Sequence, residues 1–207
     1  MVKLKEIDKV FVALDNMSLP KAESVIEKYK GKVYGFKINH SLLHSLAPYR
    51  DLNIFVDLKL WDIPNTVTSI TKHVIDLGAS YITISTLNNS RVFDDLKEYN
   101  RDIGLLGVTS LTSWTSEEES AIHNRVRQAT FWDVHINKII DNFEGIICSV
   151  PDLKKVHRAD PEHKLTRICP GIRTAPTNDD QKRTATPSEA LRKGADYLVM
   201  GRSFHNA

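Results

Sequence analysis

The sequence has few of the features that mark membrane, secreted or nucleic-acid-binding proteins. No apolar run approaches the roughly 20 residues that span a bilayer, and residues 1–6 lack the apolar core of a signal peptide. The formal net charge is only +2, so the composition demands neither a nucleic acid nor a membrane as partner. We therefore expect a cytoplasmic protein.

Cysteine is scarce, and histidine lacks the spacing of metal ligands. The two cysteines, Cys148 and Cys169, both fall within expected strands, which favours buried thiols in a reducing compartment over a disulfide or a catalytic thiol. The eight histidines show neither a His-x-His nor an HExxH pattern. We therefore expect no metal site.

Short apolar segments alternate with helical patterns along the whole chain. This alternation is typical of α/β proteins with a parallel sheet built from βαβ units, and eight such units predict a closed (β/α)₈ TIM barrel that forms a single domain over residues 1–207. An open doubly wound sheet is the alternative, although no GxGxxG follows the first strand. The expected strands are 7–14, 33–38, 52–59, 81–85, 103–109, 145–150, 165–169 and 197–200.

The end of the chain lies close behind the eighth expected strand. A complete barrel has a helix after that strand, so we expect this barrel to lack most of its eighth helix. The flank between the first and seventh helices is then uncovered, unless the long fifth helix or a dimer partner covers it.

The segment 53–66 begins as a strand and ends as the start of a helix, because Pro64 suits the first helical turn. Side chains on a strand alternate between its faces, so Phe55, Asp57 and Lys59 share one face. Apolar neighbours argue against a simple solvated strand end. A half-buried acid and base are costly unless they neutralise each other, and such groups are candidates for function.

Other charged residues also stand where expected strands end. In a barrel, the carboxyl ends of the strands form the active-site face. The glycine of the pair Gly201-Arg202 allows close backbone approach and the arginine supplies charged donors, which suits a phosphate at the end of the eighth strand. The charged residues at these ends are Asp15, Lys37, Asp57, Lys59 and Arg202.

At these positions the sequence resembles the orotidine 5'-phosphate decarboxylases. Residues 57–67 are similar to the DxKxxDIPNTV signature of that family. The resemblance extends from the first strand to the eighth, nearly the entire chain. The other segments that carry it are 13–15, 36–38, 111–113, 170–173, 180–183, 185–187 and 201–203.

The resemblance implies a cofactor-free carboxy-lyase, usually a homodimer, that converts orotidine 5'-monophosphate to uridine 5'-monophosphate (UMP) and CO₂ in de novo pyrimidine synthesis. By this resemblance, Lys59 gives a proton to C6 of the pyrimidine. Asp57 lies beside the substrate carboxylate. Lys37 and Asp62 complete a charged Lys-Asp-Lys-Asp array.

The resemblance also implies how the rest of the nucleotide is bound. Asp15 and Lys37 hold the ribose hydroxyls. Asp62, Ile63 and Thr66 reach the site of the partner subunit. The remaining implied contacts are Thr112 or Ser113 at the base, and Pro170, Arg173, Gln181, Gly201 and Arg202 at the phosphate.

The residue types also suit this chemistry on physical grounds. Loss of CO₂ from C6 leaves a carbanion that no π system delocalises, so the site must place a cation where the negative charge develops. Lys59 can do this and then supply the proton. Two lysines and two aspartates sum to zero charge, which lowers the cost of burying them together.

Two segments differ from the family pattern: 85–89 replaces an HAxxG-like sequence, and Trp61 replaces a smaller or polar residue. These differences bear on efficiency more than on the type of reaction. Two alternatives also stay open. One is an Mg²⁺-dependent sugar-phosphate decarboxylase or aldolase of the same superfamily, in which an acid typically stands at the position of Lys37. The other is a nucleotide-binding barrel without catalysis.

Overall fold

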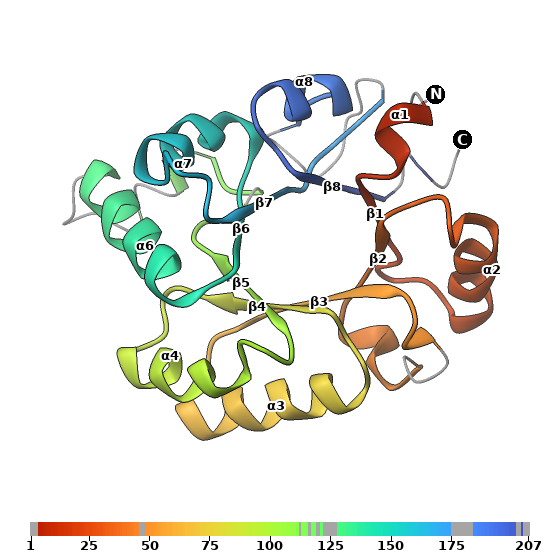
Figure 1. Ribbon diagram of the computed structural model, residues 1–207, viewed down its shortest axis with the longest axis horizontal. Helices are drawn as coiled ribbons and strands as arrows, with labels where there is room; N and C mark the ends of the chain where they lie inside the picture. Colours follow the sequence, from red (N-terminus) through yellow and green to blue (C-terminus); the bar gives the residue numbers. More distant parts are fainter. Residues whose placement is uncertain are drawn as a thin grey trace.

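Eight parallel strands form a closed barrel in sequence order, as Figure 1 shows in a view down the barrel. The computed structural model describes residues 4–45, 49–111, 113–115, 117–118, 121, 128–174, 184–201 and 204. The strands are β1 (Val10–Ala13), β2 (Gly35–Ile38), β3 (Asn53–Leu60), β4 (Tyr81–Ser85), β5 (Gly104–Val108), β6 (Gly145–Ile147), β7 (Thr166–Cys169) and β8 (Tyr197–Met200). The expected TIM barrel is confirmed.

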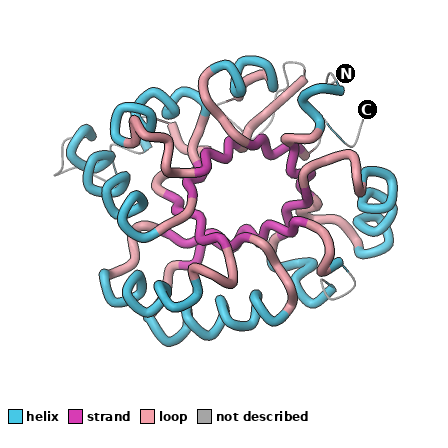
Figure 2. Tube along the Cα trace, viewed as in Figure 1, coloured by secondary structure: helices cyan, strands magenta, loops and turns pink. Residues whose placement is uncertain are grey.

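Helices surround the barrel on its outer face (Figure 2). They are α1 (Leu4–Ile7), α2 (Leu19–Tyr29), η1 (His40–Ser45), α3 (Pro64–Asp76), α4 (Ser90–Leu96), η3 (Lys97–Tyr99), α6 (Gln128–Asn142), η4 (Val150–Asp152), α7 (Leu153–Ala159) and α8 (Pro187–Arg192). Helix α3 begins at Pro64, and Gly78 follows its end with φ +85°, a conformation that glycine adopts without steric cost. No helix in the described part of the chain combines the length and apolar character that a bilayer crossing needs.

Aromatic side chains fill the barrel near the amino ends of its strands. The Phe11 ring lies edge-on to Tyr34, Phe55, Tyr81 and Tyr197, with ring centroids 5.0, 5.5, 5.9 and 5.8 Å away. Edge-to-face packing at these distances is favourable for aromatic rings. The open mouth of the barrel therefore lies at the opposite end, where the charged residues are.

The two faces of β3 belong to different cores. Phe55 joins the cluster inside the barrel, whereas Ile54 and Val56 join the larger cluster between strands and helices. This division follows from the alternation of side chains along a strand. It places Asp57 on the inner face, two residues beyond Phe55 and closer to the mouth.

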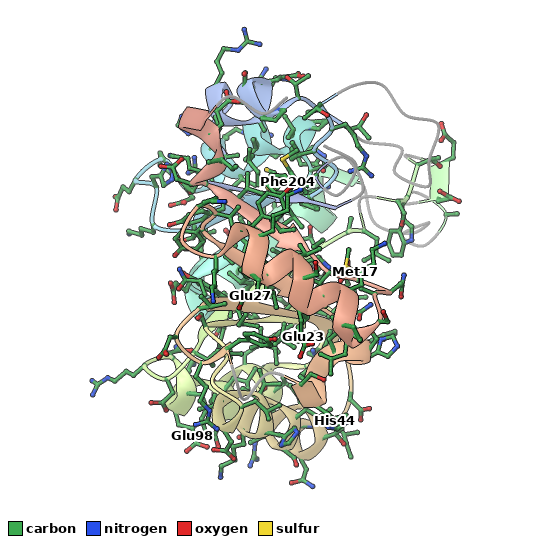
Figure 3. All side chains as sticks on the ribbon, turned by 90° about the vertical axis from the view of Figure 1, so that its right-hand side faces the viewer. Met17, Glu23, Glu27, His44, Glu98 and Phe204 are labelled. Atoms are coloured by element: carbon green, nitrogen blue, oxygen red, sulfur yellow. The ribbon has the colours of Figure 1, made fainter. Side chains whose placement is uncertain are left out.

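The flank beyond β8 has covering groups that the sequence did not reveal. Helix α1 occupies the segment before β1 and lies between α8 and α2 around the barrel (Figure 1). It is tied to α8 by a 2.6 Å hydrogen bond from Ser188 Oγ to Glu6 Oε1. Phe204, which is labelled in Figure 3, is 4% exposed, and its ring packs edge-on against that of Tyr29 in α2. These contacts cover part of this flank, whereas the described part of the long fifth helix, α6, packs beside α7 and β6.

Candidate active site

Four charged side chains from three neighbouring strands meet at the mouth. The Lys37 ammonium lies 2.5 Å from Asp15 Oδ2 and 3.1 Å from Asp57 Oδ2. The Lys59 ammonium lies 2.7 Å from Asp57 Oδ1. Asp15 follows β1, Lys37 belongs to β2, and the other two belong to β3. The structure thus brings these four predicted site residues together, with the signs of charge alternating along the row.

The inner members of the row are the more deeply buried. Lys37 and Asp57 side chains are 8% and 14% exposed, whereas Lys59 is 40% exposed toward the mouth. Burial alone raises the pKa of Asp57, but the ammonium groups of Lys37 and Lys59 outweigh it and hold the pKa below its ordinary value. Burial likewise lowers the pKa of Lys37, while Asp57 and Asp15 raise it above the ordinary value. Both inner groups therefore stay ionised at neutral pH.

Strand β3 is irregular where it carries the array. Val56 pairs with Ile82, but the next pair joins Leu60 to Ile84. The chain therefore advances four residues along β3 while it advances two along β4, which is a β-bulge. Within this bulge Lys59 has φ +50°, a left-handed conformation that costs a residue other than glycine on the order of 1–3 kcal/mol. Bulges commonly redirect a side chain beside an active site.

Thr83 of β4 is hydrogen-bonded to this bulge, a contact that the sequence analysis did not predict. Its Oγ1 accepts a hydrogen bond from the Lys59 backbone N–H at 2.8 Å and donates one to Asp57 Oδ1 at 3.1 Å. Thr83 is fully buried. Threonine is common in strands, so its presence here did not suggest a function. The only feature of the sequence that could have indicated one is that Thr83 lies on the same strand face as Ser85.

Asp62 lies apart from the row of four. Among the described residues, the ion pairs of the mouth do not include it, and its Oδ1 accepts the Ile63 N–H at 2.7 Å. Its own N–H donates to Asn88 Oδ1 at 3.2 Å, and the Asn88 amide donates to Leu60 O at 2.8 Å and Ser85 O at 2.9 Å. Asn88, which is 3% exposed, therefore fixes the end of β3 on both sides of Trp61.

The other predicted binding residues are distributed around the mouth. Pro170 follows β7 and Gly201 follows β8. Arg173 is 8% exposed and its backbone N–H donates to Ala185 O at 2.9 Å. Ser113 and Thr66 are partly buried, and Ile63 is 65% exposed. The residues Thr112, Gln181 and Arg202 lie outside the described part of the chain.

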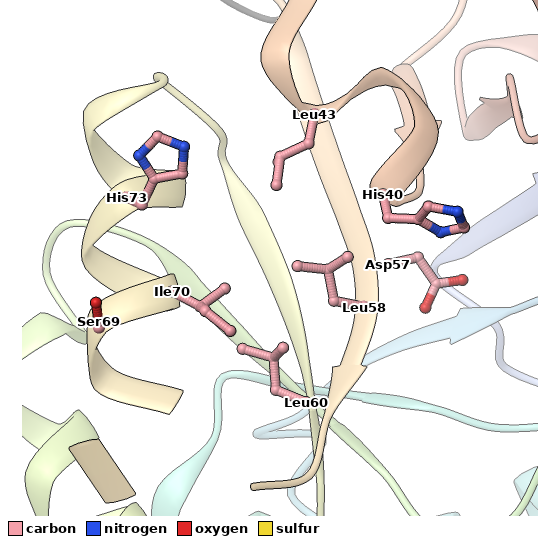
Figure 4. A pocket seen from close by; sticks show the side chains of 8 residues that line it. All are labelled: His40, Leu43, Asp57, Leu58, Leu60, Ser69, Ile70 and His73. Carbon is pink, nitrogen blue, oxygen red and sulfur yellow. The ribbon is translucent and has the colours of Figure 1, made fainter. Parts of the chain in front are cut away.

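A mainly apolar pocket lies between β3, η1 and α3 (Figure 4). In this view Leu58 and Leu60 point toward α3, while Asp57 points to the other side of the strand. No cluster of three His, Cys, Asp or Glu side chains forms within the described residues. The pocket is lined by His40, Leu43, Asp57, Leu58, Leu60, Ser69, Ile70 and His73.

Comparison with known proteins matches both the sequence and this architecture. The chain is 31% identical to an orotidine 5'-phosphate decarboxylase of Carboxydothermus hydrogenoformans, over 94% of this chain and 88% of that protein. It is 32% identical to the enzyme of that name from the Wolbachia of Brugia malayi, over 95% and 91%.

A solved structure of orotidine 5'-phosphate decarboxylase from Lactobacillus acidophilus superimposes with a TM-score of 0.79 at 26% identity, covering 97% of this chain and 92% of that one. The model of the orotidine 5'-phosphate decarboxylase / HUMPS family matches residues 8–207. The chain therefore belongs to the orotidine 5'-phosphate decarboxylase / HUMPS family.

Proposed function

We propose that this protein is a carboxy-lyase that converts orotidine 5'-monophosphate to UMP and CO₂ without a cofactor, in de novo pyrimidine synthesis. The observation that carries the proposal is the row Asp15–Lys37–Asp57–Lys59 at the mouth of the barrel. Membership of the decarboxylase family supports it.

Lys59 is the proposed proton donor. The bond between C6 and the carboxyl carbon breaks, CO₂ leaves, and the electron pair stays on C6. An ammonium beside C6 stabilises that charge as it develops, because a fixed cation in a partly dry site needs no reorganisation. Lys59 then gives C6 a proton and regains one from solvent. Its 40% exposure leaves the ammonium accessible from the mouth, while Asp57 fixes its direction.

Asp57 and Lys37 set the charge around the reacting carboxylate. Asp57 stays ionised because two lysines hold its pKa down against the effect of burial. We place it beside the substrate carboxylate, where it repels the ground state more than the less charged transition state. Lys37 balances Asp57 and Asp15, so the array can stay buried without a large net charge.

The ribose is proposed to bind at Asp15 and Lys37. Asp15 Oδ1 is buried and has no hydrogen-bond partner among the described residues, so an acceptor is available for a ribose hydroxyl. The base is assigned to Thr112 or Ser113. The phosphate is assigned to Pro170, Arg173, Gln181, Gly201 and Arg202.

We propose that the working unit is a homodimer in which Asp62, Ile63 and Thr66 act in the site of the partner subunit. Trp61 and Ile63 are 68% and 65% exposed, on a turn that Asn88 holds in place. Large apolar side chains at such exposure favour an interface. The apolar pocket beside β3 offers a surface for the partner's turn (Figure 4).

The remaining assignments concern the chain as a whole. We propose one domain over residues 1–207 and a cytoplasmic location. The closed barrel supports the single domain. The two buried free cysteines support the location, because they suit a reducing compartment.

Absorbance of orotidine 5'-monophosphate on adding the purified protein tests the reaction. We expect a progressive change that leaves UMP and is unaffected by EDTA. Loss of turnover with EDTA selects the Mg²⁺-dependent alternative. Lys37 argues against that alternative, because its ammonium lies between two carboxylates. Nucleotide binding without any change in absorbance selects the non-catalytic alternative.

A further inference from the structure

We infer that Thr83 is a positioning residue, which holds Lys59 and Asp57 in the geometry that proton transfer to the substrate needs. This inference rests on the proposed roles of Lys59 and Asp57 in decarboxylation. Thr83 belongs to β4 and acts through these two residues of the neighbouring strand.

The backbone of Lys59 needs a partner that regular strand pairing does not supply. The ladder between β3 and β4 is interrupted from Val56 to Leu60, and Lys59 lies within the interruption at φ +50°. A residue other than glycine keeps such a conformation only where its surroundings over-determine it. The hydrogen bond from the Lys59 N–H to Thr83 Oγ1, at 2.8 Å, links this backbone to β4.

The same hydroxyl also fixes the carboxylate to which the Lys59 side chain is paired. Because Thr83 Oγ1 accepts the hydrogen bond of the Lys59 backbone N–H, the Thr83 hydroxyl can itself donate, and it donates to Asp57 Oδ1 at 3.1 Å. That oxygen also accepts the Lys59 ammonium at 2.7 Å. Backbone, ammonium, carboxylate and hydroxyl form a closed ring, so the position of Lys59 Nζ is fixed from both ends of the residue.

The next hydroxyl on the same face of β4 is engaged elsewhere. Ser85 is the next residue on that face, and its Oγ accepts the Leu87 N–H at 3.2 Å. Thr83 is fully buried, so water has little access to its hydroxyl. Removal of the hydroxyl therefore leaves the Lys59 N–H without this partner and loosens the lysine.

Three variants of the full-length enzyme separate positioning from folding. Thr83→Val keeps the shape of the side chain and removes the hydroxyl, whereas Thr83→Ser keeps the hydroxyl. Thr71→Val is the matched control, because Thr71 is equally buried in α3 and its hydroxyl has no partner among the described residues. Folding is followed by circular dichroism and thermal melting, and turnover by absorbance.

We expect Thr83→Val to lower kcat at least about tenfold with KM changed much less, because the defect lies in the chemical step. Thr83→Ser should return most of the lost kcat, and Thr71→Val should keep wild-type kcat. If Thr83→Val does not fold, Thr83→Ala replaces it, with the same expected loss.

The result that overturns the inference is a folded Thr83→Val or Thr83→Ala enzyme with wild-type kcat, or a Thr83→Ser enzyme as slow as Thr83→Val. Lys59→Ala, measured in parallel, separates this failure from failure of the proposed function. An active Lys59→Ala enzyme contradicts the role of Lys59 itself. An inactive Lys59→Ala enzyme beside a fully active Thr83→Val enzyme contradicts only the role of Thr83.

Discussion

The Lys59 ammonium lies 2.7 Å from Asp57 Oδ1, and the two residues are joined a second time through the hydroxyl of Thr83. The other oxygen of the same carboxylate lies 3.1 Å from the buried Lys37 ammonium. The Asp57 carboxylate thus holds the ammonium groups of both lysines in position. The proposed proton donor is therefore held by a fixed, ionised partner, which is the preorganisation that electrostatic catalysis requires.

Asp57→Asn should destabilise the protein in a pH-dependent way. The variant lacks the charge-assisted hydrogen bonds that Asp57 makes with two lysines. We therefore expect its free energy of unfolding at neutral pH to be lower by roughly 2 kcal/mol. The pKa of Asp57 is lowered on folding from an ordinary value of 3.8, so its stabilising effect is present above that value and fades as pH falls toward the folded pKa.

Chemical denaturation of wild type and Asp57→Asn between pH 7 and pH 3 checks this expectation. The difference in stability should be constant down to about pH 4 and should then shrink. A difference that is the same at every pH would contradict the assigned charge state of Asp57.

Asn88→Ala should slow turnover by releasing the turn that carries Asp62. The amide of Asn88 contacts Leu60 O, Ser85 O and the Asp62 N–H. If Asn88 acts through Asp62, the loss in kcat/KM should be much smaller when Asp62→Ala is already present, because the two lesions share one cause. Equal losses with and without Asp62→Ala would show that Asn88 acts independently.

Asn89→Ala is the matched control for Asn88. Asn89 Oδ1 caps α4 by accepting the Val92 N–H at 3.2 Å. Its removal should cost about 1 kcal/mol of stability and leave kcat/KM unchanged, since it does not contact the end of β3. Thermal melting and steady-state kinetics on the same preparations distinguish the two asparagines.

The barrel and the row of charges could be predicted from sequence because local patterns specify them. Apolar segments such as 81–85 and 197–200 are bounded by turn residues and match β4 and β8 as predicted. Asp57 and Lys59 follow from strand alternation, and Pro64 marks the start of α3.

The contacts that support the site could not be predicted in the same way. Thr83 and Asn88 act across strands, on backbone groups 24 to 28 residues away, and a single sequence does not give such distances. The bulge at Lys59 is also invisible, because its φ of +50° belongs to a residue type with no preference for it. Helix α1 was missed because four residues are too few for a periodic pattern.

Arg167→Met should destabilise the barrel without changing its chemistry. Arg167 and Asp160 are 1% and 3% exposed, and the guanidinium bonds to Asp160 O at 2.8 Å and to its Oδ2 at 3.2 Å. A buried carboxylate left without its cation typically costs about 3–5 kcal/mol. Thermal and chemical denaturation should show this loss, while kcat measured well below the melting temperature should stay at the wild-type value.

Lys164→Ala supplies the comparison for that buried pair. Lys164 makes an exposed ion pair with Glu162 at 2.8 Å, and exposed pairs contribute little to stability. Its melting temperature should equal that of the wild type. An Arg167→Met protein as stable as Lys164→Ala would mean that the buried pair is dispensable.

Mixing Lys59→Ala, which we expect to be inactive, with Asp62→Ala, which we expect to keep only a small residual activity, tests the shared site. In a mixed dimer of Lys59→Ala and Asp62→Ala chains, one site collects both lesions and the other has native Lys59 and native Asp62. With random exchange about half the dimers are mixed, so roughly a quarter of wild-type activity should return. Exchange must be shown separately with a size-tagged chain. Complete exchange with no recovered activity would place Asp62 in its own subunit or outside the mechanism.

Turnover of orotidine 5'-monophosphate by Lys59→Ala, compared with wild type and with the exposed-lysine control Lys97→Ala, tests the central assignment most directly. Lys97 pairs only with Asp94 on the surface among the described residues, so its variant should keep full activity. Lys59→Ala should be folded by circular dichroism and produce no measurable UMP, since Lys59 is the proposed source of the C6 proton. Folded Lys59→Ala protein with turnover close to wild type would contradict the proposed mechanism.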